Sequence, residues 1–261
     1  MLRFISISSG SNGNCYYFGD EESAILVDVG IGFRTVKQRL EACGVDLKKI
    51  GAVLVTHDHS DHIRGLGTLA KRLSVPVFAT SRLHDALSRT KYAEDCYPGC
   101  RRVIKTGMLY DYRGVHFFAM EVPHDATQTL CYGIDYKGVK IFLMTDLGFI
   151  PDYAEKFARE ADYIIIESNY DVEMLLKGPY PQDLKSRIMG DFGHLENSVS
   201  AGFISKIYND NLKGVFLCHI SKENNLPELA YETMRKSIAV PNEGFILQAL
   251  PRSEVYETLL R

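Results

Sequence analysis

The sequence predicts an α/β protein of the α+β kind, in which short buried strands are interspersed with amphipathic helices. Apolar, β-branched runs at 51–55 and 162–167 have the length and composition of buried strands. Residues 32–43 and 63–73 carry apolar side chains at helical spacing. Since no repeat, low-complexity tract or linker interrupts the chain, we expect one domain over residues 1–261.

The predicted elements follow in order along the chain. Residues 2–8, 15–18 and 24–28 are short strands with no helix between them, which is typical of a meander. Further strands are predicted at 75–79, 108–112, 115–122, 129–136, 139–144, 212–218 and 244–249, and further helices at 80–91, 197–208 and 227–238.

The composition is that of an ordinary soluble globular protein, with 46% hydrophobic residues and a formal net charge of -3. This charge excludes a general polycation, so a nucleic-acid partner must be bound through a local patch and through metals. We expect no signal peptide in residues 1–7, no membrane span and no membrane partner. Only Cys96 and Cys100 lie close together among six scattered cysteines, which favours free thiols and a cytoplasmic protein.

The segment 56–62, Thr-His-Asp-His-Ser-Asp-His, connects a predicted strand to a predicted helix. Its imidazoles, on His57, His59 and His62, and the carboxylate of Asp61 are of the kinds that bind zinc, manganese and iron. A polar surface loop is the alternative, but this density of titratable groups favours a metal site. We expect Asp61 also to cap the N-terminus of the helix.

Three more candidate ligands stand at predicted strand ends, namely His124, Asp146 and His219. Seven ligands suit two divalent ions. We expect one ion to be held by His57, His59 and His124, and the other by Asp61, His62 and His219. Asp146 would bridge ions that are about 3.5–4 Å apart, and a hydroxide held between them is a nucleophile at neutral pH.

Two nearby features remain open at this level. Asp28 ends a strand beside the histidine loop, where it either orients a ligand or is a plain turn residue. The turn at 8–14 either holds a phosphate with backbone N–H groups or is a plain hairpin loop.

The motif His57-x-His59-x-Asp61-His62, followed in order by His124, Asp146 and His219, resembles the hallmark of the metallo-β-lactamase-fold hydrolases. The resemblance extends over essentially the whole chain. It implies a four-layer αββα sandwich with mixed sheets and with the metals at one sheet edge.

Within that superfamily the chain is most similar to the YycJ/WalJ family of DNA exonucleases. The similarity rests on residues 9–14, 167–171, 193–197 and 217–225. True β-lactamases of this fold commonly have cysteine at the place of Asp146. The 72 residues between Asp146 and His219 leave no room for the β-CASP insertion that is typical of RNase J.

The resemblance implies a metal-dependent phosphodiester hydrolase that acts on DNA in the 5′-to-3′ direction. The implied catalytic residues are Asp61, which positions the nucleophile, His194, which assists the leaving group, and Glu167, which orients His194. The implied substrate contacts are Ser11, Asn14, Ser168, Asn169, Ser221 and Lys222. Lys177, Lys185 and Arg187 are further candidates for phosphate binding.

Two rival hypotheses remain. The first is a small-molecule hydrolase that cuts a cyclic phosphodiester, a lactone or a thioester on the same dimetal centre. The second is a non-catalytic protein with a vestigial metal site, against which the complete ligand set argues. A salt-dependent affinity for DNA separates a nuclease from the first rival. The sequence carries no prediction of an oligomeric state.

Overall fold

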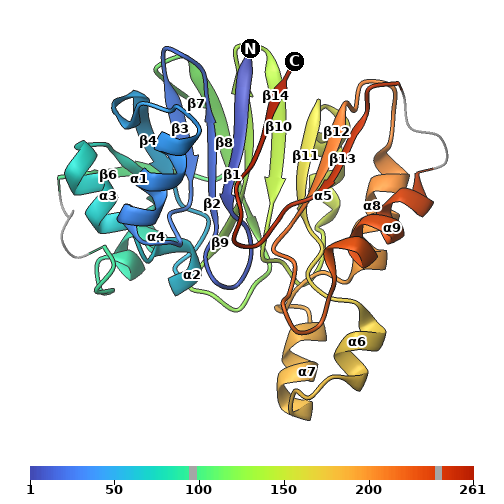
Figure 1. Ribbon diagram of the computed structural model, residues 1–261. Coiled ribbons are helices and arrows are strands. Elements are labelled where there is room, and N and C mark those ends of the chain that lie inside the picture. The colour runs from blue at the N-terminus through green and yellow to red at the C-terminus, as the bar shows by residue number, and fades with distance from the viewer. Residues whose placement is uncertain (94–98, 239–242) are drawn as a thin grey trace.

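The computed structural model describes residues 1–93, 99–238 and 243–261, and Figure 1 shows two β-sheets standing between two sets of helices. Within these ranges each sheet has seven strands. The layers therefore run helix, sheet, sheet, helix. This is the four-layer αββα arrangement with mixed sheets that the family resemblance implies.

The first sheet is antiparallel from β14 to β3 and parallel from β3 to β6. Its strands, in spatial order, are β14 (Tyr256–Leu260), β1 (Leu2–Ser8), β2 (Cys15–Gly19), β3 (Ala24–Val27), β4 (Ile50–Leu54), β5 (Val77–Thr80) and β6 (Arg101–Ile104).

The second sheet is parallel from β13 to β10 and antiparallel from β10 to β7. Its strands, in spatial order, are β13 (Ile246–Ala249), β12 (Gly214–Cys218), β11 (Tyr163–Glu167), β10 (Val139–Met144), β9 (Thr129–Tyr136), β8 (Val115–Val122) and β7 (Tyr110–Tyr112).

The helices lie outside the sheets and at one end of them (Figure 1). They are α1 (Phe33–Ala42), α2 (Ser60–Ile63), α3 (Leu66–Leu73), α4 (Ser81–Leu87), α5 (Asp152–Arg159), α6 (Val172–Lys177), α7 (Gln182–Met189), α8 (Asn197–Ile207) and α9 (Pro227–Ser237), with a 3₁₀ helix at Leu47–Lys49. In Figure 1, α1 and α3 flank the first sheet and α8 and α9 flank the second. Helices α6 and α7 project at the lower end as an arm, residues 171–190.

The main core lies between the two sheets. Phe4 of β1 stacks on Phe18 of β2, with ring centroids 5.1 Å apart, and its ring lies 4.8 Å from that of Phe216 on β12. All three rings are fully buried. Burial of each such side chain contributes about 1.5–3 kcal/mol, so this contact between opposite sheets helps to fix how the sheets face each other.

The carboxyl ends of parallel strands lie at the same edge of a sheet. The loops that carry the candidate ligands therefore gather at that edge. Strands β3 and β4 run parallel, as do β10, β11 and β12. Asp28 and the loop at 55–62 follow the first pair, while Asp146, Glu167 and His219 stand at or just after the ends of the other three. The two sheets therefore bring their ligand-rich loops together at one end of the sandwich.

Besides the 3₁₀ helix, five of the described strands and helices were not predicted, namely β6, α5, α6, α7 and β14. Strand β6 is an edge strand whose first three residues are not buried, so it lacks an apolar pattern. Helix α5 buries only Ala154 and Ala158, which give a weak apolar signal. Strand β14, near the C-terminus, pairs with β1, near the N-terminus, and local sequence patterns do not predict a pairing between such distant segments.

The predicted helix at 63–73 is divided in the structure. Helix α2 ends at Ile63 and α3 begins at Leu66, because Gly65 packs closely against the chain at Val29 and donates its N–H to the Val29 carbonyl at 2.8 Å. The expected cap at Asp61 was wrong: the N-cap of α2 is His59, and Asp61 lies inside the first turn.

Three expectations concern the chain as a whole. The described residues include no helix with the length and hydropathy needed to cross a membrane. Cys96 of the Cys96–Cys100 pair lies outside the described residues, whereas Cys15, Cys131 and Cys218 are buried free thiols. A single domain over residues 1–261 stays a prediction.

Candidate metal centre

Three of the predicted site residues adopt a left-handed backbone conformation immediately beyond a strand. The φ angles are 59° at Asp28, 56° at Asp146 and 51° at His219. This region is uncommon for residues other than glycine, and such strain tends to gather at functional sites. All three side chains are buried, so the strained turns carry polar groups into the protein rather than into solvent.

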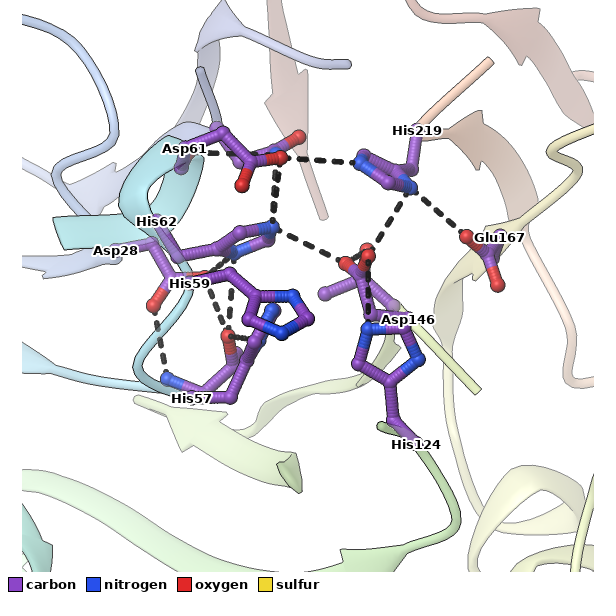
Figure 2. Close-up of polar contacts among 12 residues, drawn as sticks. Asp28, His57, His59, Asp61, His62, His124, Asp146, Glu167 and His219 are labelled. Carbon is purple, nitrogen blue, oxygen red and sulfur yellow. Dashed lines mark hydrogen bonds and ion pairs between the residues drawn. The ribbon is translucent and has the colours of Figure 1, made fainter. Parts of the chain in front are cut away.

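The seven predicted ligands converge on one another, as Figure 2 shows. His57, His59 and His124 form one group in which the potential donor atoms lie within 4.8 Å of one another, and Asp61, His62 and His219 form a second. These two groups coincide with the two ligand sets that the sequence predicts.

Asp146 lies between the two groups. One of its carboxylate oxygens is 3.2 Å from His62 Nε2, and the other is 3.9 Å from His124 Nε2 and 3.2 Å from His219 Nδ1. Its two oxygens thus face residues of both groups, which is the position required of a bridging carboxylate.

Hydrogen bonds at Nδ1 orient three of the imidazoles. His62 Nδ1 lies 2.7 Å from Asp28 Oδ2, and His219 Nδ1 lies 2.8 Å from Glu167 Oε1. His124 Nδ1 lies 2.9 Å from the carbonyl oxygen of Gly193. With Nδ1 donating to these acceptors, each ring keeps the lone pair on Nε2 for the interior of the cluster.

A buried network around Asp28 holds the histidine loop. The carboxylate accepts hydrogen bonds from the Thr56 backbone N–H at 2.8 Å and from the Thr56 hydroxyl at 2.7 Å, besides its bond with His62. The same hydroxyl oxygen lies 3.0 Å from His57 Nδ1. Asp28 therefore orients His62 through a direct hydrogen bond, and it orients His57 indirectly through the Thr56 hydroxyl.

The ionised carboxylates of the cluster stabilise positive charge on imidazoles beside them, and burial opposes it. Burial lowers the pKa of His57 well below its ordinary value and also lowers that of His124. Burial also acts to lower the pKa of His219, but nearby carboxylates, chiefly Asp146, outweigh it and raise the pKa to about 10. Burial opposes ionisation of Asp146, yet the imidazoles of His219 and His62 hold its pKa well below the usual range.

Glu167 connects a further histidine to the cluster. Its Oε1 lies 2.8 Å from Nδ1 of His194 and 2.8 Å from Nδ1 of His219, and its Oε2 accepts the backbone N–H of Leu195 at 3.0 Å. Burial opposes protonation of His194, but Glu167 outweighs it and raises the pKa. Glu167 is fully buried, so these bonds satisfy a carboxylate that has no access to water.

A hollow of about 210 Å³ opens beside the cluster. His194 and His219 line it, together with three of the predicted substrate contacts, Ser11, Asn169 and Ser221. Hydroxyl and amide groups therefore face the same space as the histidines.

The other three predicted substrate contacts lie elsewhere. Asn14 is fully buried, with its amide nitrogen 2.9 Å from His62 Nε2, and Ser168 is buried, with its hydroxyl donating to Asn197 at 2.7 Å. Neither presents a group to the hollow, so both act as internal supports here. Lys222 is exposed, does not line the hollow and stands 3.7 Å from the carboxylate of a neighbouring glutamate.

The basic residues of the arm also differ in role. Lys185 is buried, and its ammonium group donates to the carbonyl oxygens of Leu176 at 2.7 Å and Gly178 at 2.8 Å. It closes the C-terminal end of α6 instead of facing a phosphate. Arg187 lines the hollow and is paired with Asp125, which brings the arm against the loop that carries His124.

Comparison with known proteins agrees with this geometry. The family model described as a beta-lactamase superfamily domain matches residues 23–206. The chain belongs to the β-lactamase superfamily. It is 32% identical to the exodeoxyribonuclease YycJ of Bacillus anthracis over 94% of this chain and 91% of that protein. It is 31% identical to the exodeoxyribonuclease WalJ of Streptococcus pneumoniae over 93% and 90%, respectively.

Solved structures confirm the superfamily fold. The metallo-β-lactamase-fold protein YhfI of Bacillus subtilis superposes with a TM-score of 0.72 at 15% identity, covering 98% of this chain and 99% of that one. Together with the family model and the two relatives, this fold identifies the protein as a hydrolase, and the metallo-β-lactamase fold implies divalent metal ions.

The donor set fits this superfamily's metal chemistry. Among the described residues, the Nε2 atoms of His57, His124 and His219 are buried and have no hydrogen-bond partner. Leaving a buried polar atom unpaired is costly, and each case in a native structure needs an explanation, such as an ion. Two of these nitrogens belong to the first donor group and the third to the second, and together with Asp146 and Asp61 they are donors of the kind that divalent ions need.

Two residues that connect the loops of the candidate metal centre, Asp58 and Asp125, were not predicted from the sequence. The Asp58 carboxylate accepts the backbone N–H of Thr127 at 3.1 Å and its hydroxyl at 2.6 Å, which ties the histidine loop to the loop after His124. Asp125 faces both His59 and Arg187. Asp58 stands inside the histidine motif, so its position was a usable signal. Asp125 follows His124 but carries no pattern of its own.

Proposed function

We propose that this protein is a metal-dependent phosphodiesterase that degrades DNA from the 5′ end with the help of two divalent ions, zinc, manganese or iron. The observation that carries the proposal is the pair of three-residue donor groups joined by Asp146 beside a polar hollow. The names of the two relatives, both exodeoxyribonucleases, support DNA as the substrate.

In this proposal one ion is held by His57, His59 and His124 and the second by Asp61, His62 and His219, with Asp146 facing both. When bound, two such ions would supply a nucleophilic water at neutral pH and would neutralise charge on a phosphate. Asp28 and Glu167 fix the ligand imidazoles through their Nδ1 atoms.

His194 is the proposed proton donor. Its Nδ1 is bonded to Glu167, and the ring lines the hollow in which a scissile phosphate would lie. Because Glu167 raises its pKa, the protonated form of His194 is favoured, and that form can donate its proton to the leaving oxygen. Glu167 holds the ring in place and stabilises the charged form.

Substrate contacts follow from the lining of the hollow. The hydroxyls of Ser11 and Ser221 can donate hydrogen bonds to phosphate oxygens. The Asn169 amide lines the same hollow but already donates to the carbonyl oxygen of His219 at 2.8 Å, so it supports that ligand. Arg187 stands at the same hollow and offers a charged donor. A DNA substrate and the buried free thiols also support a cytoplasmic location, which we keep as part of the proposal.

The test uses end-labelled double-stranded DNA. Protein stripped of metal should release no nucleotides, and manganese or zinc should restore release with a polarity that the label reveals. Asp61→Ala should lower the rate by at least about a hundredfold, because it removes a proposed ligand. Asp111→Ala, at a surface carboxylate that is 63% exposed, should match the wild type. A loss confined to Asp61→Ala excludes a contaminating nuclease, which would act equally in all three preparations.

The small size of the hollow favours one rival, a hydrolase of small phosphodiesters, lactones or thioesters. If protein with full metal occupancy leaves DNA and RNA intact but cleaves a generic phosphodiester or lactone, the nuclease proposal is wrong and this rival replaces it.

A further inference from the structure

A second hollow, of about 400 Å³, adjoins the candidate metal centre on the His124 side. Three aromatic side chains that line it are unusually exposed, namely Phe149 at 46%, Phe192 at 61% and Tyr153 at 37%. His124 and Arg82 line the same hollow. Large exposed apolar side chains gathered at one place mark a binding surface more often than chance packing.

The loops that carry the two phenylalanines are held firmly by backbone contacts. Gly148 donates its N–H to the Pro123 carbonyl at 2.9 Å, and Asp125 donates its N–H to the Phe192 carbonyl at 3.0 Å. A Cβ atom on Gly148 would stand only 2.2 Å from the Asp191 carbonyl oxygen, so the two loops touch. The backbones of these two loops therefore support each other, and the two rings line the hollow next to His124, just after the end of β8.

Two arginines line this hollow and the one beside it. The Arg82 side chain is 63% exposed, with its guanidinium 3.6 Å from the Glu121 carboxylate. A neighbouring hollow shares Arg82 and Thr127 with the first and adds Arg89. Two acidic residues also line it, and both already have partners: Asp58 is bonded to Thr127, and Asp85 lies 3.1 Å from the guanidinium of Arg101. The guanidinium groups of Arg82 and Arg89 therefore remain as its anion-binding groups.

We propose that the aromatic hollow binds unpaired bases of the nucleic-acid strand that is cut, with Phe149 and Phe192 stacking on bases and Arg82 binding a phosphate. The inference rests on the proposed nuclease function and deepens it, since it makes an unpaired strand the bound form of the substrate. Aromatic rings stack on any base, and a guanidinium group binds the adjacent backbone, which is how single strands are held without sequence preference. A duplex end then has to fray before cleavage.

The first test measures binding without cleavage. Metal-free protein in chelator is titrated with a single-stranded oligonucleotide that contains 2-aminopurine, whose fluorescence changes when the base stacks. We expect Phe149→Ala and Phe192→Ala each to weaken binding by about tenfold or more. Phe192→Leu keeps an apolar side chain and should also weaken binding, while Leu259→Ala, at a 42% exposed residue of β14, should not.

The second test removes the base instead of the ring. An oligonucleotide with abasic sites keeps its phosphates, so it should bind the wild type about tenfold or more weakly, yet bind the Phe149→Ala/Phe192→Ala double variant as the intact oligonucleotide does. Additive losses in this cycle would overturn the stacking proposal.

Other outcomes are separable. If the wild type cleaves DNA and the aromatic variants bind single strands as the wild type does, this inference is wrong while the proposed function stands. If the wild type cleaves no nucleic acid in any metal, the proposed function itself has failed. A wild-type dimer in solution that Phe192→Ala or Phe192→Leu dissociates would show that a second copy covers the rings, and would also overturn the inference.

Discussion

His62 Nδ1 and Asp28 Oδ2 lie 2.7 Å apart, and both side chains are completely buried. Burial raises the pKa of Asp28, whereas the imidazole opposes that rise. A buried carboxylate stays charged only with such partners, so this contact fixes the tautomer of His62 and the ionisation of Asp28 together. The pair thus connects the end of β3 to the start of α2.

Replacing Asp28 by Asn is expected to weaken metal binding by about 10- to 100-fold. The amide is nearly isosteric, but it neither carries charge nor forces the proton onto His62 Nδ1. Competition with a chromophoric chelator measures the affinity, and the surface change Asp111→Asn serves as the control. An unchanged affinity in Asp28→Asn would show that Thr56 alone orients the loop.

Adding metal should stabilise the protein strongly. Three unpaired buried Nε2 atoms and the surrounding carboxylates bind the ion only in the folded chain, so ligand binding shifts unfolding by mass action. At a free-ion concentration of one hundred times the dissociation constant, the gain is about 2.7 kcal/mol. Thermal unfolding with and without chelator measures it. His57→Ala should abolish most of the gain, and a full gain in that variant would contradict the assigned ligand.

Two glycines four residues or fewer from Asp28 should respond very differently to substitution. A Cβ atom on Gly30 would meet the Asp61 carbonyl oxygen at 1.6 Å, whereas one on Gly32 would meet nothing within 4 Å. Gly30→Ala must displace the loop that carries Asp61, and overpacking of this kind costs about 1–3 kcal/mol.

Gly32→Ala is therefore the matched control, because its φ of -60° and ψ of 144° suit any residue. Denaturant unfolding measures the stability of each variant, and metal affinity measures the displacement of Asp61. Equal stability and equal metal affinity in the two variants would contradict the close approach of Gly30 to the backbone of Asn14 and Asp61.

The residues of the proposed ligand set could be selected from the sequence because four of them share one motif shortly after β4, while His124, Asp146 and His219 each follow an apolar run. Strand ends are local signals, and the fold then brings them to one edge. Asp146 illustrates this, because the apolar residues of β10 predict a strand and the carboxylate follows shortly after its end.

Residues that act through distant partners could not be predicted. Ser168 and Asn14 belong to motifs that resemble substrate-binding segments, yet each is buried against a side chain far away in sequence. The exposed rings of Phe149 and Phe192 were missed for the opposite reason. Sequence assigns apolar residues to the core, and only the structure shows which of them are left outside.

Lys185 was a candidate for phosphate binding, but in the structure its ammonium group stabilises the C-terminal end of α6. Its ammonium group holds two carbonyl oxygens at the end of α6, and Lys185→Met leaves both without that donor. We expect the arm to open more readily, by about 1–3 kcal/mol, because buried carbonyls lose a charged partner. Hydrogen exchange of amides in residues 171–190 measures this opening directly. Lys177→Met removes an equivalent charge from an exposed pair with Glu173 and should leave exchange unchanged, so equal exchange in both variants would show that the Lys185 contacts add no stability.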